Sequence, residues 1–255
     1  GGGTKNGPKE IIKASHQVEL YDEELNCEPF KKIGIKTLKP FKIDKNINKA
    51  LGKVSKINEN ILKKNIFPLT LGGEHSITPG CIYPFTKKYK NLCILHFDAH
   101  ADLRDSYNGE KYSHASAIRR CLDYKNVSLI SFGIRNISKG EIPFLKKNSS
   151  RIKIFWAKDK EKWNLKMFKK FIKNKTVYLT FDVDAFDSGI MPATGTPEPG
   201  GLLWDETLKI IKIAMKNSKV VGADVNELAP IKGFNSYNFL VAKLVYKILS
   251  YKFFY

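Results

Sequence analysis

The sequence predicts an α/β fold built around a mainly parallel central sheet, and three observations support this prediction. Short, continuous apolar runs recur along the chain, amphipathic lysine-rich stretches separate them, and polar clusters follow several of the runs. Continuous apolar runs are typical of strands that are buried on both faces of a sheet. Strands that alternate with helices favour parallel pairing through right-handed crossovers, with helices on both sides of the sheet.

The elements can be assigned in chain order from these patterns. Six strands are expected, each of them an apolar run, at residues 67–71, 92–97, 127–132, 152–155, 176–181 and 220–225. Helical periodicity is found at residues 10–25, 47–64, 113–123, 164–174, 205–217 and 238–255. The last stretch is amphipathic and basic, so we expect a final helix packed on the sheet, with a membrane-surface helix as the alternative.

The length fits one large α/β domain or two small ones, and we expect a single domain at residues 1–255. The chain is 42% hydrophobic and 27% charged, which is ordinary for a soluble fold. No apolar stretch approaches the roughly 18 residues that span a membrane, and no charged-then-apolar leader precedes a cleavage site. The four cysteines are scattered without a Cys-x-x-Cys pair, which is typical of reduced thiols. We therefore expect a cytoplasmic protein with no membrane partner.

The formal net charge of +19 is the one extreme property of the chain. A basic balance can indicate nucleic-acid binding, but the lysines are spread over nearly every segment rather than gathered in one stripe. No RNA- or DNA-binding motif is present, and the aromatic residues lie mostly inside apolar runs. We therefore expect no nucleic-acid partner, and a nucleic-acid binder stays only as a rival interpretation.

Polar clusters follow three of the expected strands, at residues 72–75, 98–102 and 182–184. In an open α/β sheet, ligands bind beyond the carboxyl ends of the strands. Asp98, His100 and Asp102 are two residues apart, so an extended backbone turns all three side chains to one side. Asp182 and Asp184 repeat this spacing.

One aspartate after a strand usually caps a helix or closes a turn, but that explanation fails for the whole set. Four unpaired carboxylates near a buried sheet edge would each lower the stability of the fold by several kcal/mol. No Arg or Lys that could pair with them lies within residues 98–102 or 182–184. Two divalent cations would balance four carboxylates, whereas one would not. Oxygen ligands with two imidazoles and no thiolate suit Mn²⁺ better than a structural Zn²⁺. The sequence therefore predicts a site for two Mn²⁺ ions.

Four motifs occur in order along the chain: Gly-Gly-Glu-His-Ser at 72–76, His-Phe-Asp-Ala-His-Ala-Asp at 96–102, Phe-Asp-Val-Asp at 181–184 and Thr-Gly-Thr-Pro-Glu-Pro-Gly-Gly at 194–201. Together they resemble the signatures of the ureohydrolases, the family of arginases and agmatinases, and agmatinase is the nearest match. The resemblance extends from about Gly3 to the C-terminus. It implies a three-layer α-β-α arginase-like fold with a mainly parallel sheet, usually assembled as trimers or hexamers.

The resemblance also implies which residues hold the metal. One Mn²⁺ would be bound by His75, Asp98, Asp102 and Asp182. The other would be bound by Asp98, His100, Asp182 and Asp184, so that Asp98 and Asp182 bridge the two ions.

The implied chemistry is hydrolysis of a guanidinium group to urea and an amine. Water that bridges two divalent ions is acidified enough to supply hydroxide at neutral pH. We expect Asp102 to orient this hydroxide as well as to bind metal. Glu227 matches the family's guanidinium-binding glutamate, and a carboxylate can pair with a planar guanidinium through two hydrogen bonds. Asp224 competes for this role because the local alignment can slip.

Protonation of the departing amine requires a second group. His114 resembles the family's proton-shuttle histidine, and an imidazole titrates in the suitable range. The alternative is a polar surface histidine at the start of a helix. His96 is expected either to support Asp98 or to be a hydrogen-bonded core residue, and His16 is expected on the surface.

The substrate is expected to be agmatine, which would give putrescine and urea. The segment 103–113 resembles the agmatinase type rather than the arginase loop that holds an α-amino acid. Glu110 or Asp105 would receive the distal ammonium group, unless both are solvated loop charges. Guanidinobutyrate, arginine and a catalytically silent metal-binding relative are the alternatives.

Three features depart from the family pattern. Family members usually carry a further segment with a first strand before the Gly-Thr-x-x-Gly-Pro element, which occupies residues 3–8 here. Ser188 and Gly189 replace the usual proline after Asp187, and Ile231-Lys232-Gly233 replaces the Tyr-Asp continuation of many agmatinases. We therefore expect differences at the sheet edge, in the Pro-Gly loop and in the substrate contacts.

Overall fold

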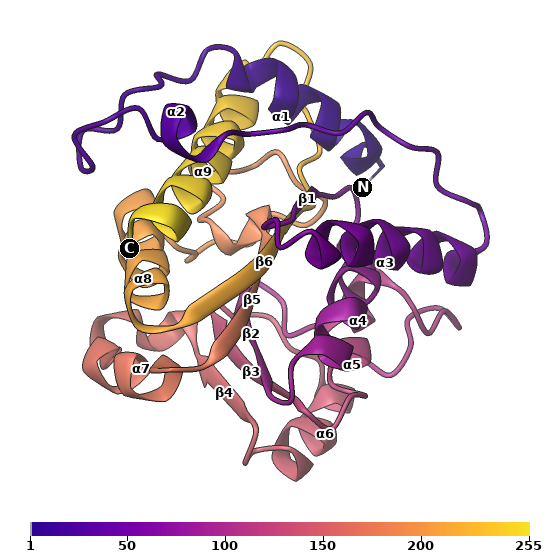
Figure 1. Cartoon of the computed structure of the whole chain (residues 1–255). Helices are drawn as coiled ribbons and strands as arrows, with labels where there is room; N and C mark the ends of the chain where they lie inside the picture. Colours follow the sequence, from indigo (N-terminus) through magenta and orange to yellow (C-terminus); the bar gives the residue numbers. More distant parts are fainter. Residues whose placement is uncertain (1) are drawn as a thin grey trace.

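The computed structural model describes residues 2–255 and is built around a six-stranded sheet in which every strand pair is parallel (Figure 1). The strand order is β1-β6-β5-β2-β3-β4. The strands are β1 (Leu69–Leu71), β2 (Leu92–Phe97), β3 (Val127–Phe132), β4 (Ile152–Phe155), β5 (Thr176–Asp182) and β6 (Lys219–Asn226). The predicted parallel sheet is confirmed.

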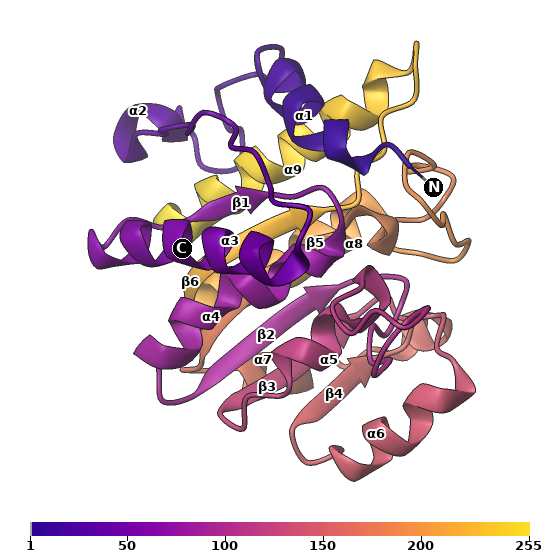
Figure 2. The ribbon, with the colours of Figure 1, turned by 90° about the vertical axis from the view of Figure 1, so that its right-hand side faces the viewer.

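Helices cover both faces of the sheet, which gives three layers (Figures 1 and 2). One layer consists of α3 (Ile47–Lys63), α4 (Thr78–Lys88), α5 (Ala117–Cys121) and α6 (Ile142–Lys147). The other consists of α1 (Gly7–Ser15), α7 (Leu165–Ile172), α8 (Trp204–Asn217) and α9 (Asn235–Phe254), with the short α2 (Pro29–Ile33) near α9. Alternate residues of the central strands enter the two cores, as Leu95 and Ile94 do. The predicted three-layer α-β-α arrangement is confirmed.

The predicted strand boundaries are close to the observed ones. Strands β2, β3 and β4 begin and end where the apolar runs do. Strand β1 begins two residues later than predicted, because Pro68 has no N–H group to donate to a ladder. Its carbonyl still accepts the N–H of Ala223 on β6.

Two predicted helices are wrong in length. The predicted 10–25 helix ends at Ser15, where the N–H groups of Gln17 and Val18 donate three residues back, to Ala14 and Ser15, instead of four. Further along, the side chain of Asp22 accepts the N–H groups of Glu24 and Leu25 and so competes with a helical backbone. The 113–123 helix is reduced to a 3₁₀ turn and α5, because the N–H of Arg119 donates to Asp102 in the preceding loop instead of continuing the helix. Helices α4 and α6 were not identified in the sequence.

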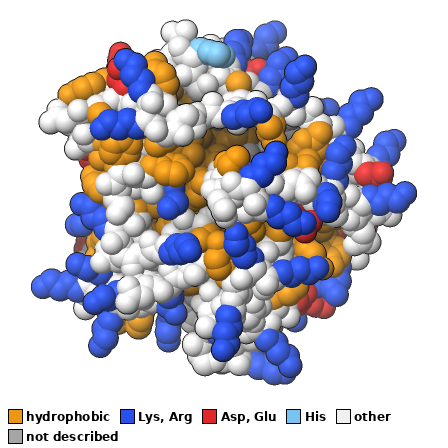
Figure 3. Space-filling view, in the orientation of Figure 1, with side chains coloured by type: hydrophobic (Ala, Val, Ile, Leu, Met, Phe, Trp, Pro, Cys, Tyr) orange, Lys and Arg blue, Asp and Glu red, His pale blue; other side chains and the backbone are white. Residues whose placement is uncertain are grey.

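The C-terminal helix α9 packs on the fold, as predicted, rather than lying free at the surface. It contacts α1, α2 and α8, and its Val241, Leu244 and Ile248 are buried in the core. Within residues 2–255, no helix combines the length and the apolar character needed to cross a membrane. All four cysteines are free, and His16 is exposed at the end of α1. Lys and Arg side chains are scattered over the face shown in Figure 3.

The sheet order brings the polar clusters together. Strand β5 lies between β6 and β2, with Phe181 beside Phe97 and Asp182 beside Asn226. Strand β1 lies on the far side of β6, where Leu71 pairs with Val225. The segments that follow β1, β6, β5 and β2 therefore meet at one edge, the carboxyl edge of a parallel sheet.

Candidate metal centre

His75 occupies the inner end of the cluster, in a 3₁₀ turn that follows β1. The turn begins close to β6: a Cβ atom on Gly72 would lie 2.0 Å from Asn226 Oδ1, so glycine is needed there. The Nδ1 atom of this fully buried histidine lies near three carboxylate oxygens, at 3.1 Å from Asp98, 3.2 Å from Asp102 and 3.4 Å from Asp182.

His100 forms the second half of the cluster. Its Nδ1 lies 3.0 Å from Asp184 Oδ2 and 3.4 Å from Asp98 Oδ1, and its side chain is one-quarter exposed. Asp98 therefore faces both histidines, with Oδ2 toward His75 and Oδ1 toward His100. The structure thus brings all six predicted metal ligands together in two groups that share Asp98.

Backbone N–H groups hold three of the carboxylates in place. Asp98 accepts the N–H of His100 at 2.6 Å, Asp182 accepts that of Asp184 at 2.9 Å, and Asp184 accepts that of Ala99 at 2.9 Å. Asp102 instead has a left-handed backbone, with φ of 52°. A non-glycine residue in that conformation is strained, and such strain is typical of functional sites.

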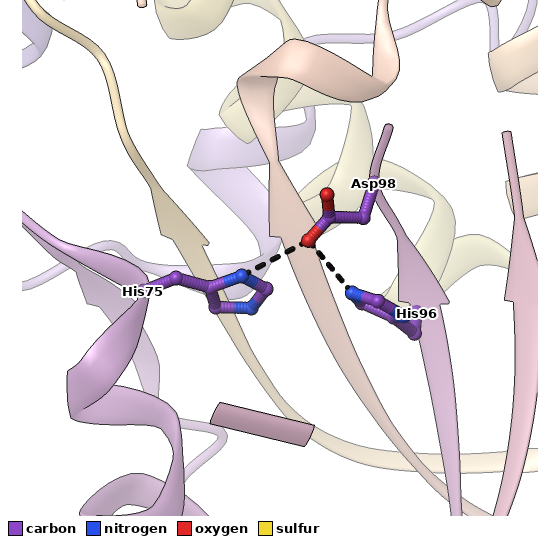
Figure 4. A group of neighbouring side chains, drawn as sticks. All are labelled: His75, His96 and Asp98. Atoms are coloured by element: carbon purple, nitrogen blue, oxygen red, sulfur yellow. Dashed lines mark hydrogen bonds and ion pairs between the residues drawn. The ribbon is translucent and has the colours of Figure 1, made fainter. Parts of the chain in front are cut away.

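His96 lies behind Asp98 on strand β2. Figure 4 shows His75 and His96 on either side of the same oxygen, and His96 Nε2 is 2.9 Å from Asp98 Oδ2. The other ring nitrogen of His96 is 3.1 Å from Ser131 Oγ on β3. This fully buried histidine is therefore both hydrogen-bonded in the core and in contact with Asp98.

The electrostatics of the cluster show that it needs positive charge. Burial raises the pKa of Asp182 well above its usual range, and the negative charges of Asp184 and Asp98 raise it further. Burial and the charge of Asp98 raise the pKa of Asp184 to about 6. Burial alone would lower the pKa of His100, but the hydrogen bonds to Asp184 and Asp98 raise it to about 12. The carboxylates therefore favour any cation that can enter between them.

The donor set fits divalent metal ions. His75 Nδ1 is buried and has no hydrogen-bond partner among the described residues, although it faces three carboxylate oxygens. In octahedral coordination, neighbouring ligand atoms bound at about 2.1 Å lie about 3.0 Å apart, close to the separations found here. Two groups of potential ligands, His75-His96-Asp98 and Asp98-His100-Asp184, are compact enough to hold an ion.

A buried hydrogen-bond network orients His75 from behind. His75 Nε2 lies 2.9 Å from Thr180 Oγ1, and the Thr180 hydroxyl donates to Asp224 at 2.6 Å. The proton of His75 is thereby placed on Nε2, which leaves the Nδ1 lone pair directed at the cluster. Tyr178 also donates to Asp224, at 2.8 Å. Thr180 was not identified in the sequence, because a lone threonine in an apolar strand has no distinguishing pattern.

Asp224 and Glu227, the two candidates for guanidinium binding, lie in different environments. Asp224 is fully buried, and its oxygens already accept hydrogen bonds from Tyr178, Thr180 and Asn226. Glu227 lies past the end of β6 with φ of 66°, and Oε1 accepts the N–H of His75 at 2.6 Å. Burial raises the pKa of Glu227 to about 7. Of these two carboxylates, only that of Glu227 accepts no hydrogen bond from a hydroxyl group among the described residues.

A cavity of about 350 Å³ lies outside the cluster, lined by His114, Glu74, Tyr107, Glu110, Tyr112 and Ser113 among others. His114 Nδ1 is 3.4 Å from Glu74 Oε1, and this contact raises the pKa of His114. Glu110 follows an Asn108-Gly109 turn in which both residues have positive φ, so its position is well defined.

Of the two candidates for the distal ammonium group, only Glu110 lines this cavity. Asp105 is paired with Arg120 at 2.8 Å and with Arg119 at 3.4 Å, away from the cavity. Lys232, whose type departs from the family pattern, is exposed and does not line the cavity. Glu74 lines it and was not identified from the sequence as a site residue, since its motif was interpreted through His75.

The chain is similar to known proteins over nearly its whole length. A sequence model of the arginase family matches residues 1–250. The N(1)-aminopropylagmatine ureohydrolase of Synechocystis sp. is 34% identical in an alignment 259 positions long, which covers 98% of this chain and 83% of that protein. The agmatinase of Bacillus anthracis is 36% identical over 235 residues, which cover 90% of this chain and 78% of that protein.

A solved structure agrees with these relatives. The agmatine ureohydrolase of Thermoplasma volcanium has a TM-score of 0.88 and 28% identity, with coverage of 99% of this chain and 85% of that one. The predicted resemblance is thus confirmed by a family match, by sequence relatives and by a shared fold. The chain belongs to the arginase family and is a hydrolase of that family.

Proposed function

We propose that the protein hydrolyses the guanidinium group of agmatine or a closely related guanidino amine to urea and the free amine, using two Mn²⁺ ions. The observation that carries this proposal is the pair of ligand groups that share Asp98, with the carboxylate of Glu227 beside them. A site built only for structure would not need a further partly buried carboxylate that accepts one hydrogen bond among the described residues.

The metal ions would be held by the six residues whose side chains converge at the sheet edge: His75, Asp98, His100, Asp102, Asp182 and Asp184. Two divalent cations there would acidify water and so supply a nucleophile near neutral pH. Mn²⁺ is proposed because carboxylate oxygens dominate the ligand set and no thiolate is present in it.

The remaining steps depend on the protein's own side chains. Glu227 binds the planar guanidinium group, and its charge favours the cationic substrate over a neutral urea. Water oxygen adds to the guanidinium carbon, and the bond from this carbon to the alkyl-bearing nitrogen breaks. That nitrogen leaves as an amine only if it gains a proton, and His114 at the cavity wall provides it.

A second candidate substrate is N1-aminopropylagmatine, which carries one more amine. The cavity beside the site has two glutamates, Glu74 and Glu110, in its wall and neither Lys nor Arg among its lining residues. This wall favours a cationic chain over the carboxylates of arginine and guanidinobutyrate. The similarity to a ureohydrolase named for this substrate supports the same candidate.

A urea-release assay with Mn²⁺ across these four substrates tests the proposal. Agmatine or N1-aminopropylagmatine is expected to be hydrolysed with kcat/KM at least about 10-fold above arginine and guanidinobutyrate, because the cavity wall is acidic. Glu110→Gln should lower the kcat/KM of the preferred amine, whereas Asp105→Asn, the matched surface carboxylate, should not. Urea release from arginine alone would overturn the proposal.

Glu227→Gln is expected to raise KM and lower kcat while both metal ions remain bound. Removing the charge from a charge-assisted pair costs roughly 1.5–3 kcal/mol, or about 10- to 10²-fold in kcat/KM. The matched variant is Asp224→Asn, whose site is buried behind His75 and should affect metal binding before substrate binding. Loss of substrate affinity in the Asp224 variant alone would assign the guanidinium to Asp224 instead.

We further propose that the chain acts as a single domain in the cytoplasm and assembles as a trimer or hexamer. Light scattering of the purified protein would measure the assembly. A monomer at micromolar concentration would contradict it.

A further inference from the structure

Arg135, just beyond β3, is the most extensively bonded side chain near the site. Its guanidinium donates to five backbone carbonyl oxygens, those of Gly133 (2.9 Å), Asp184 (2.8 Å), Phe186 (3.1 Å), Glu198 (2.7 Å) and Pro199 (3.0 Å). A planar fork of five N–H groups can satisfy several fixed acceptors at once, which a lysine ammonium cannot do with the same geometry.

These carbonyls belong to three separate segments. Gly133 lies at the end of β3, Asp184 and Phe186 lie at the turn that follows β5, and Glu198 and Pro199 lie in the loop before α8. Among the described residues, helix and strand bonds do not satisfy these acceptors, and Arg135 joins all three segments at one point. The second and third segments are also joined by backbone hydrogen bonds between Asp187 and Leu202 and between Leu202 and Ala185. One of the three carries the metal-ligand candidate Asp184.

Asp187 binds the loop before α8 through its carboxylate, which accepts backbone N–H groups, whereas Arg135 donates to backbone carbonyls. Its carboxylate accepts the N–H groups of Gly189 at 2.8 Å, Gly200 at 2.7 Å and Gly201 at 2.9 Å. Gly201 must lie close to this turn, since a Cβ atom there would be 2.5 Å from Asp187 N. The loop is therefore anchored at its carbonyls by Arg135 and at its N–H groups by Asp187, although Ser188 replaces the usual proline.

The anchored loop brings Glu198 to His100. Glu198 Oε1 accepts a hydrogen bond from Asn136 Nδ2 at 2.7 Å and lies 3.9 Å from His100 Nε2. His100 Nδ1 faces Asp184 and Asp98, so the proton of its neutral ring belongs on Nε2, toward Glu198. Both sides of the His100 group, Asp184 and Glu198, thus depend on segments that Arg135 holds.

We propose that Arg135 is a positioning residue for one half of the metal centre, the half formed by His100 and Asp184. This inference rests on the proposed two-metal function. The His75 half has its own support in Thr180 and Asp224, and Arg135 makes no hydrogen bond to that network among the described residues. Loss of Arg135 should therefore weaken one ion and spare the other.

This inference is tested by titrating Mn²⁺ into the metal-stripped wild-type and Arg135→Lys proteins. Calorimetry measures the affinity of each ion, and electron paramagnetic resonance shows whether the ions are spin-coupled. The wild type should bind two ions with a spin-coupled signal. In the variant, the affinity of one ion should fall by roughly 10- to 100-fold, the usual effect of removing support behind a metal ligand. At limiting Mn²⁺ the signal should become that of isolated ions.

Arg151→Lys is the matched control. Arg151 also binds backbone carbonyls, those of Tyr124 and Val127, and the side chain of Asn148, but at the amino end of β3. This variant should lose thermal stability and keep both Mn²⁺ affinities. If Arg135→Lys does not fold, Glu198→Gln, which alters only the partly exposed carboxylate, should weaken the same ion.

The outcomes separate this inference from the proposed function. Wild-type protein that binds fewer than two ions would overturn the two-metal proposal and the inference with it. Two ions in the wild type, combined with unchanged or equally weakened affinities in both the Arg135 and Glu198 variants, would overturn the inference alone.

Discussion

Asp98→Asn is expected to abolish the binding of both metal ions and with it the hydrolysis of guanidino substrates. The two oxygens of Asp98 face different histidines, with Oδ2 3.1 Å from His75 Nδ1 and Oδ1 3.4 Å from His100 Nδ1. An asparagine removes the shared charge and presents an NH₂ group to one of the two halves. The rate of urea release should therefore fall by at least roughly 10³-fold, which corresponds to about 4 kcal/mol of lost metal-dependent stabilisation.

Metal analysis after gel filtration, together with urea release, measures this effect. Asp105→Asn is the control, because Asp105 lies in the same loop region and is exposed, with its carboxylate on Arg120 instead of the cluster. The control should keep both ions and full activity. Two tightly bound ions in the Asp98 variant would show that the ligand assignment is wrong.

Burial alone would raise the pKa of Asp98, but its hydrogen bonds with His100, His75 and His96 hold it well below its usual range, so the charge of Asp98 stabilises the metal-stripped fold. Burial and neighbouring carboxylates raise the pKa values of Asp182 and Asp184, so these groups repel one another in the absence of a cation. Asp98→Asn removes the contacts with the histidines together with part of this repulsion, so the metal-stripped variant is expected to melt below the metal-stripped wild type, and metal binding is compared at a temperature where both are folded. This comparison separates loss of metal from loss of fold.

His114→Asn is expected to lower kcat by roughly 10²- to 10⁴-fold, the usual range for a general acid or base. Metal content should not change, because His114 contacts Glu74 and Tyr107 in the cavity wall and none of the six proposed ligands. Added imidazole should restore part of the rate, since a small base can enter the cavity. The control is His16→Asn, which changes an exposed histidine at the end of α1, distant in sequence from His114.

Dependence on the leaving group gives the sharper result. A substrate whose departing amine is weakly basic needs less protonation and should lose less rate in the His114 variant. An equal loss for every leaving group would mean that His114 positions the substrate and transfers no proton.

Much of the fold could be predicted because local sequence controls it. Strand β2 is buried at every position and β3 at all but one, and each directly follows an asparagine, so burial defines both. Strand β4 lies at the edge of the sheet and keeps only its two end residues buried. The six proposed ligands were identified for a related reason. They directly follow buried strands at two-residue spacing or in a glycine-rich turn, and parallel strands end at a common edge.

The two shortened helices show where the local sequence pattern does not predict the helix boundaries. The last part of the predicted 10–25 helix is not helical, because Asp22 binds the backbone N–H groups of Glu24 and Leu25 and is itself held by the buried Lys247 on α9 at 2.9 Å. A contact between residues so distant in the sequence leaves no periodic signal. The same holds for the 113–123 helix, whose first turn exchanges bonds with the loop at Asp102.

The sequence by itself determined the parallel α/β class, the strand positions and the set of candidate ligands, because these depend on burial and on spacing along the chain. Only the tertiary structure decided what each polar residue does. It buried Asp224 behind His75, where hydroxyl groups donate to it, and placed Glu227 against the backbone N–H of His75. It also paired Asp105 with Arg120 and brought Arg135 against five carbonyl oxygens from three segments. The physical reason is that the role of a polar group depends on which donors and acceptors surround it, and those neighbours come from distant parts of the chain.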